Sequence, residues 1–130
     1  MSNENAHVLG QFLARLAEPT TARDAFTLVA DDFVAHEPAS LPYGGEHHGA
    51  DGFRKLLGAI NRLFLLEVKD LHVRGCGDIA FADVDMRFTS QANGQVLDTR
   101  VVELYTIRDG KIAGLHVFYQ DTKAMTALCR

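Results

Sequence analysis

The sequence has no tryptophan, only two cysteines and three prolines, and no long hydrophobic run. Its longest uninterrupted aliphatic or aromatic segment, Leu63–Leu66, is far shorter than the ~20 residues that a membrane-spanning helix needs. Cys76 and Cys129 are too few for a disulfide framework and lack the CxxC spacing of a zinc knuckle. These absences argue against a helical membrane protein and against a small cysteine-stabilised scaffold.

Positive charge is also scarce. Lysine and arginine total 13 against 17 aspartates and glutamates, which gives a net charge of −4 without a basic stripe, so no nucleic-acid partner is expected. The polar segment Ser2–Asn5 lacks the basic region and apolar core of a secretion signal, so we expect a cytoplasmic protein with no membrane partner. The 130 residues, 47% of them hydrophobic, predict a single domain over residues 1–130.

A β-hairpin near the C-terminus is the strongest pattern that is present. The β-rich runs Arg100–Ile107 and Ile112–Tyr119 flank Asp109-Gly110, a dipeptide typical of tight hairpin turns. Glu103 is the only acid in the first run. It is therefore either a structural carboxylate with a partner of its own or half of a functional site.

Three amphipathic helices are predicted before the sheet. Apolar residues recur at helical spacing from Val8 to Leu16, and Pro19 marks the end of that helix. A similar period predicts a second helix from Thr20 or Thr21 to about Ala30. The apolar stripe Phe53–Ile60 predicts a third.

Strands and turns fill most of the remaining chain. Phe33–His36 is a short predicted strand that leads into Pro38–Gly49, an irregular segment of the kind that frequently carries function. Two long strands are predicted, at Phe64–Val73 with imperfect alternation and at Ala80–Phe88 with clean alternation. Asn93-Gly94 predicts another hairpin turn, and Asp121–Leu128 a short closing helix.

These elements predict an α+β fold. Three helices and four long antiparallel strands can bury their apolar faces only if the helices lie across one curved sheet. We therefore expect a cone-shaped curved antiparallel sheet whose concave face is covered by the three N-terminal helices. Such an arrangement leaves a ligand pocket between the helices and the sheet.

The same order of elements resembles a known family. The motifs Ala30-Asp31-Asp32, His36-Glu37-Pro38 and Asp109-Gly110-Lys111-Ile112, at their places between helices and strands, are similar to the nuclear-transport-factor-two-like superfamily, in its SnoaL-like and ketosteroid-isomerase-like branch. The resemblance covers nearly the whole chain and implies a cystatin-like α+β barrel. It is more specific for fold than for function, because the superfamily includes isomerases, polyketide cyclases, epoxide hydrolases, dehydratases and non-catalytic binding domains.

The resemblance also implies roles for individual residues. The proton-abstracting acid of the ketosteroid isomerase pattern lies just before a proline and matches Glu37, and its protonated, oxyanion-stabilising acid lies in the penultimate strand and matches Glu103. The phenol on the first helix of that pattern matches Phe12, which has no hydroxyl. Tyr43, in the loop before Gly44, is a candidate to supply a hydroxyl instead.

General physical chemistry supports the pair of acids independently. A carboxyl in an apolar pocket binds its proton more tightly, and two neighbouring carboxyls titrate as a coupled pair. The alternative is structural: Glu37 caps a turn or pairs with Arg54 or Lys55, and Glu103 forms a cross-strand ion pair with Arg87. The sequence leaves both interpretations open.

The expected pocket is lined mainly by apolar and aromatic side chains, which suit a core equally well. The candidate substrate-binding residues are Phe12, Leu16, Phe33, His36, Phe53, Leu57, Val84, Met86, Tyr105, Leu115, Val117 and Tyr119.

Histidines are the remaining chemically active group. His36, His47 and His48 accompany Glu37 and have the ligand types of a metal site, yet no HxxxH or HExxH spacing fixes one. We therefore expect neither a metal nor another cofactor. His116 alternates with Leu115 and Val117, and the resemblance implies that the latter two face the pocket, so His116 is expected on the convex face.

Two functions of different classes stay open. One is an isomerase, cyclase or dehydratase that transfers a proton on an apolar carbonyl compound, with Glu37 as base and with Glu103 and Tyr43 stabilising the enolate. The other is a non-catalytic module that binds a small apolar ligand in the pocket or a protein on the sheet.

The outer face of the sheet predicts self-association. Val102, Leu104, His116 and Phe118 are predicted to point away from the pocket, and such a face is too apolar to leave in water. We expect a homodimer through the sheet. Sedimentation as a monomer at micromolar concentration would contradict it.

Overall fold

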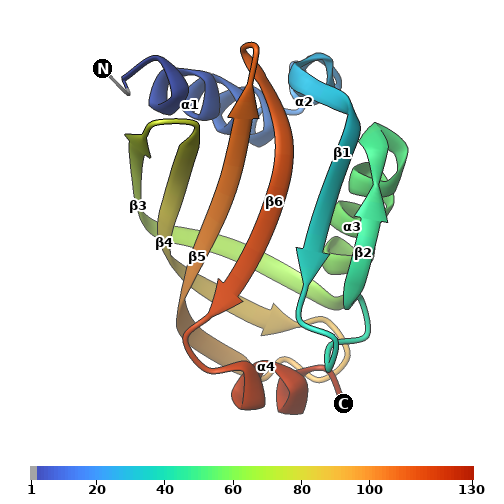
Figure 1. The fold of residues 1–130 in the computed structure, drawn as a ribbon. Helices are drawn as coiled ribbons and strands as arrows, with labels where there is room; N and C mark the ends of the chain where they lie inside the picture. The colour runs from blue at the N-terminus through green and yellow to red at the C-terminus, as the bar shows by residue number, and fades with distance from the viewer. Residues whose placement is uncertain (1–2) are drawn as a thin grey trace.

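The computed structural model describes residues 3–130, in which helices cover one face of a curved sheet (Figure 1). The helices are α1 (Asn3–Ala17), α2 (Ala22–Ala25), the 3-10 turn η1 (Phe26–Leu28), α3 (Gly49–Leu63) and α4 (Thr122–Leu128). The strands are β1 (Val29–Glu37), β2 (Gly45–His48), β3 (Phe64–Cys76), β4 (Ile79–Ser90), β5 (Val96–Arg108) and β6 (Lys111–Tyr119).

The strands form one sheet in the order β2-β1-β6-β5-β4-β3, which is curved but not closed. Neighbouring strands are antiparallel, except that β1 runs parallel to β6. The long helices α1 and α3 lie across the concave face (Figure 1). The predicted α+β class, with a curved sheet covered by N-terminal helices, is confirmed. The parallel pair was not predicted; the long chain segment between β1 and β6 allows it, because parallel neighbours need a crossover.

Two elements differ from the sequence prediction. The second helix ends at Ala25 and is followed by η1, and Val29 and Ala30 lie buried in β1 instead of in a helix. The hydroxyl of Thr27 donates to the carbonyl oxygen of Asp24 at 2.7 Å, a local bond that favours a helix end. The predicted loop also contains a short strand, β2, which pairs with the end of β1.

The predicted hairpin of β5 and β6 sets the register of the inner face. Asp109 and Gly110 have φ values of 54° and 74°, the left-handed backbone that a type I′ turn requires. Glu103 pairs opposite Val117, and Tyr105 opposite Leu115, so all four side chains share the concave face.

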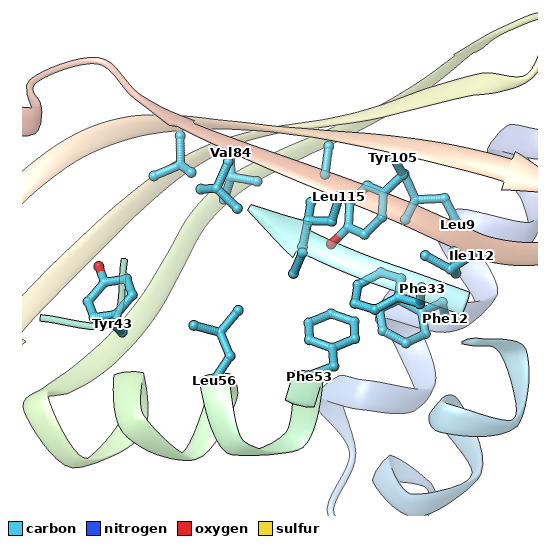
Figure 2. Close-up of a cluster of buried hydrophobic side chains, with 14 of the residues drawn as sticks. Leu9, Phe12, Phe33, Tyr43, Phe53, Leu56, Val84, Tyr105, Ile112 and Leu115 are labelled. Carbon is cyan, nitrogen blue, oxygen red and sulfur yellow. The ribbon is translucent and has the colours of Figure 1, made fainter. Parts of the chain in front are cut away.

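An aromatic cluster holds the helices to the sheet. Phe53 of α3 stacks on Phe33 of β1 with centroids 4.7 Å apart and on Phe12 of α1 at 5.7 Å. All three rings are buried, and Figure 2 shows them gathered between the helices and β1. Tyr43 lies apart from this cluster, beyond Leu56 (Figure 2). No helix within residues 3–130 is both long enough and apolar enough to cross a membrane.

Candidate functional site

A cavity of about 550 Å³ opens between α1, α3 and the inner faces of β3, β4 and β5. Its volume is within the range of roughly 300–1,000 Å³ typical of small-molecule sites. Its lining is apolar apart from three side chains, Arg54, Asn61 and Glu103. The apolar lining, with one glycine, consists of Leu13, Leu16, Ala17, Ala22, Phe26, Leu57, Gly58, Leu66, Val68, Leu71, Val84 and Met86.

A β-bulge in β3 places Val68 and Leu71 on the same wall of the cavity. Val68 pairs with Met86 and Asp70 with Asp85, so Lys69 is an extra residue between them. A one-residue bulge reverses which face the following side chains take. Leu71, opposite Val84, therefore continues the inner face that Val68 began, which explains the imperfect alternation of this strand in the sequence.

Glu103 is the one acid that lines the cavity in the described part of the chain. The hydroxyl of Tyr105, two residues later on the same face of β5, donates to its Oε1 at 3.1 Å. Burial raises the pKa of the Glu103 carboxyl, and the Tyr105 hydrogen bond opposes part of that rise. The cavity thus holds a carboxyl that keeps its proton more readily than an ordinary glutamate.

A second acid, Glu37, lies at the end of β1 and is only 8% exposed. The Tyr119 hydroxyl donates to its Oε1 at 2.9 Å, and the Tyr43 hydroxyl lies 2.9 Å from that of Tyr119. Burial raises the pKa of Glu37 to about 8; the Tyr119 hydrogen bond acts against this rise, and the charge of Glu103 adds to it. The two acids are therefore electrostatically coupled.

The phenols beside Glu37 remain protonated. Burial raises the pKa of Tyr119 and of Tyr43, and the neighbouring Glu37 charge raises both further. A phenol that keeps its proton can donate to a carboxylate but cannot act as a base. Tyr43 and Tyr119 thus form a hydroxyl chain that ends on Glu37.

The loop after β1 fixes the position of Tyr43 by close backbone packing. The amide of Leu41 donates to the Pro38 carbonyl at 3.1 Å, and that of Gly44 to the Leu41 carbonyl at 2.9 Å. A Cβ on Gly44 would overlap the Pro38 carbonyl oxygen. Glycine is therefore needed at this position because there is no space for a side chain.

The structure separates the candidate residues that line the cavity from those that lie in the core or in the hydroxyl chain. Leu16, Leu57, Val84 and Met86 line the cavity together with Glu103. A larger group lies in the core, outside the cavity lining: Phe12, Phe33, Phe53, Tyr105, Leu115 and Val117. The hydroxyl chain is also outside the lining and consists of Tyr43, the half-buried Tyr119 and Glu37.

His36 is not in the pocket. Its ring stacks on that of His116 with centroids 4.2 Å apart, on the convex face of the sheet. The physical reason is strand alternation, because Glu37 points inward and an adjacent residue must point outward. His36 therefore cannot contact a ligand in the cavity.

The alternative ion pairs predicted for the two acids do not form in the structure. Arg87 makes a two-bond pair with Asp98, at 2.8 and 3.1 Å, and Arg54 pairs with Asp51 at 2.9 Å. Within residues 3–130, no group of three or more His, Cys, Asp or Glu side chains is arranged to hold a metal ion.

Sequence reasoning missed several lining residues, Arg54 and Asn61 of α3 and Leu66, Val68 and Leu71 of β3 among them. The β3 side chains are unusually exposed for large hydrophobic residues; Val68, for example, is 57% exposed. A run of apolar residues with broken alternation is the signal that could have identified this wall.

Comparisons with known proteins agree with this architecture. A family model described as SnoaL-like domain matches residues 9–115. An NTF2-like protein from Burkholderia xenovorans LB400 has the same fold, with a TM-score of 0.90, 16% identity, and coverage of 100% of this chain and 98% of the other. None of the curated proteins matches the sequence.

Two further solved structures share the fold. TerC, crystallised with polyporic acid, has a TM-score of 0.81 and 18% identity over 97% of this chain and 98% of its own. A proposed polyketide cyclase from Xanthomonas campestris pv. campestris has a TM-score of 0.77 and 18% identity over 96% of each chain. These structures, one of them an NTF2-like protein, share the fold, and the family match shows that this chain belongs to the SnoaL-like domain family.

Proposed function

We propose that the protein binds a small apolar carbonyl compound in the cavity and transfers a proton on it without a cofactor, as an isomerase, cyclase or dehydratase would. The observation that carries this proposal is Glu103, a carboxyl of raised pKa in an otherwise apolar lining. Such a group can exchange a proton with carbon near neutral pH. The family, and a structural relative that is a proposed polyketide cyclase, support the reaction class.

In this proposal the carboxylate accepts a proton from the carbon next to the carbonyl. The C–H bond breaks, its electron pair forms an enolate, and the proton stays on the carboxyl until it returns to another atom of the substrate. The cavity lining favours Glu103 for this contact, although the sequence favoured Glu37. Glu37 lies outside the cavity lining, and its part in the reaction is indirect: the charge of Glu103 raises the pKa of Glu37, so the two acids interact.

The test is exchange of the α-protons of 2-tetralone in deuterated water, followed by proton NMR. Wild-type protein is expected to accelerate exchange, and Glu103→Gln to lose about 100-fold or more, because general acid–base catalysis contributes about 10²–10⁴-fold. The acceleration should rise with pH, because only the deprotonated carboxyl accepts a proton and burial raises the pKa of Glu103 above its ordinary value.

A matched control is Glu67→Gln, which removes a solvent-exposed glutamate on β3. It should exchange protons like wild type. Equal acceleration by the Glu103→Gln variant and by wild type would contradict the proposed chemistry.

Ligand binding without turnover is the second candidate function. Phe12 supports it, because this buried ring has no hydroxyl and packs against Phe53, Phe26 and Tyr105. Binding of an apolar probe without any acceleration of proton exchange would favour this function over the enzyme.

We also propose self-association through the convex face. Phe118 is 55% exposed there, beside the stacked rings of His36 and His116 and the half-buried Val102 and Leu104. Covering this face would remove apolar area from water. The expected result is a dimer in sedimentation equilibrium that Phe118→Glu converts to a monomer; a monomeric wild type would contradict it.

A further inference from the structure

Arg54 gives the cavity a positive charge that neither the reaction nor the core requires. It projects from α3 one turn before Gly58 and is the one cation in the lining within the described residues. Its guanidinium carbon lies 4.7 Å from the ring centroid of Phe26, another lining residue. A cation held over an aromatic face has a preferred position at the cavity wall.

The ion pair with Asp51 leaves most of the hydrogen-bond donors of Arg54 available to a ligand. Nη1 donates to Oδ1 of Asp51 at 2.9 Å, but the Asp51 side chain is 88% exposed. Exposed pairs of this kind contribute little to stability, and a guanidinium has five N–H donors. An incoming anion can therefore bind the same guanidinium and exclude water from it.

Glu103 is the one acidic group in the cavity lining within the described residues. Glu103, the lining acid, lies in apolar surroundings that raise its pKa and favour its neutral form. The remaining lining is uncharged. The cavity therefore combines a fixed positive charge, one carboxyl that binds its proton more tightly than an ordinary glutamate, and apolar walls.

We propose that the ligand of this cavity is an apolar molecule with an anionic oxygen group, such as a carboxylate, and that Arg54 binds that group. This inference rests on the proposed cavity function and names its ligand class. A guanidinium matches the planar geometry of a carboxylate with two parallel hydrogen bonds. The anion fixes one end of the ligand, so the apolar body lies along α1 and β3 toward Glu103. Arg54 is thus a specificity-determining residue.

The test uses two fluorescent probes with the same aromatic skeleton. 1-Anilinonaphthalene-8-sulfonate is anionic, whereas N-phenyl-1-naphthylamine lacks the sulfonate and is neutral. Arg54→Gln is expected to weaken binding of the anionic probe about tenfold, or ~1.4 kcal/mol, and to change the affinity for the neutral probe by no more than about twofold. Arg54→Lys, which keeps the charge but not the planar fork, should lie between wild type and Arg54→Gln.

The matched control is Lys55→Gln, which removes the same charge from the next residue of α3, outside the cavity lining. It should bind both probes like wild type. An equal loss for both probes in Arg54→Gln, or no loss for either, would overturn the role of Arg54 while leaving the cavity function intact. Failure of wild type to bind either probe would overturn the cavity function and this inference together.

Discussion

Glu37→Gln is expected to remove most of the fall in stability that the wild-type protein shows as pH rises from about 5 to about 8.5. The carboxyl of Glu37 has a pKa of about 8 in the folded protein, against 4.5 ordinarily. A raised pKa means that the folded state holds a proton that the unfolded chain releases. The stabilisation is complete below the unfolded pKa and is lost as pH rises through the folded one.

The size of this effect is large for a single residue. A shift of one pKa unit corresponds to ~1.36 kcal/mol, so Glu37 alone accounts for a loss of at most about 5 kcal/mol in the free energy of unfolding. Glutamine is neutral and can still accept the hydrogen bond of Tyr119. The variant should therefore be more stable than wild type at pH 8.5 and similar to it at pH 5, as measured by urea unfolding.

The Glu37→Gln variant should still lose some stability as pH rises, because the pKa of Glu103 is also raised and lowers the free energy of unfolding in the same direction. Glu67→Gln, on the exposed side of β3, is the control and should retain the wild-type profile. A wild-type stability that stays constant or increases between pH 5 and pH 8.5 would contradict the burial of a protonated Glu37.

Phe53→Ala is expected to lower the free energy of unfolding by about 3–5 kcal/mol, the usual cost of removing a buried phenylalanine ring. Phe53 is 2% exposed and contacts Phe12 and Phe33 by stacking and Phe26 edge-on. Its removal leaves a void where α1, α3 and β1 meet. Chemical unfolding measures the loss directly.

Leu57→Ala provides the matched comparison, one turn further along α3. Leu57 lines the cavity and is only partly buried, so its loss should cost less than about 2 kcal/mol and should weaken binding of N-phenyl-1-naphthylamine. Equal losses of stability in the two variants would show that the division between core and cavity is wrong.

The fold was predictable because its signals are local. Asp109-Gly110 defines the turn, and the alternation of the flanking runs then places Glu103 and Tyr105 on one face. The helical stripe that contains Phe53 is equally clear in the sequence. Each of these signals depends on residues close together in the chain.

The site was less predictable because it depends on long-range packing. The extra residue Lys69 shifts the inner face of β3, and alternation alone does not show which residue is inserted. Arg54 looks like an ordinary surface arginine until Phe26, from a separate turn, packs beside it. The outward position of His36, in contrast, follows from that of Glu37 by simple alternation, and the sequence interpretation overlooked it.

A carboxyl carbon-13 NMR titration shows whether Glu37 and Glu103 are two coupled acids within this apolar interior. In wild type, Glu37 should titrate near pH 8, and Glu103→Gln should lower that value because the Glu103 charge no longer opposes ionisation. Titration of both carboxyls near the ordinary value of 4.5, with neither affected by replacement of the other, would contradict this coupling.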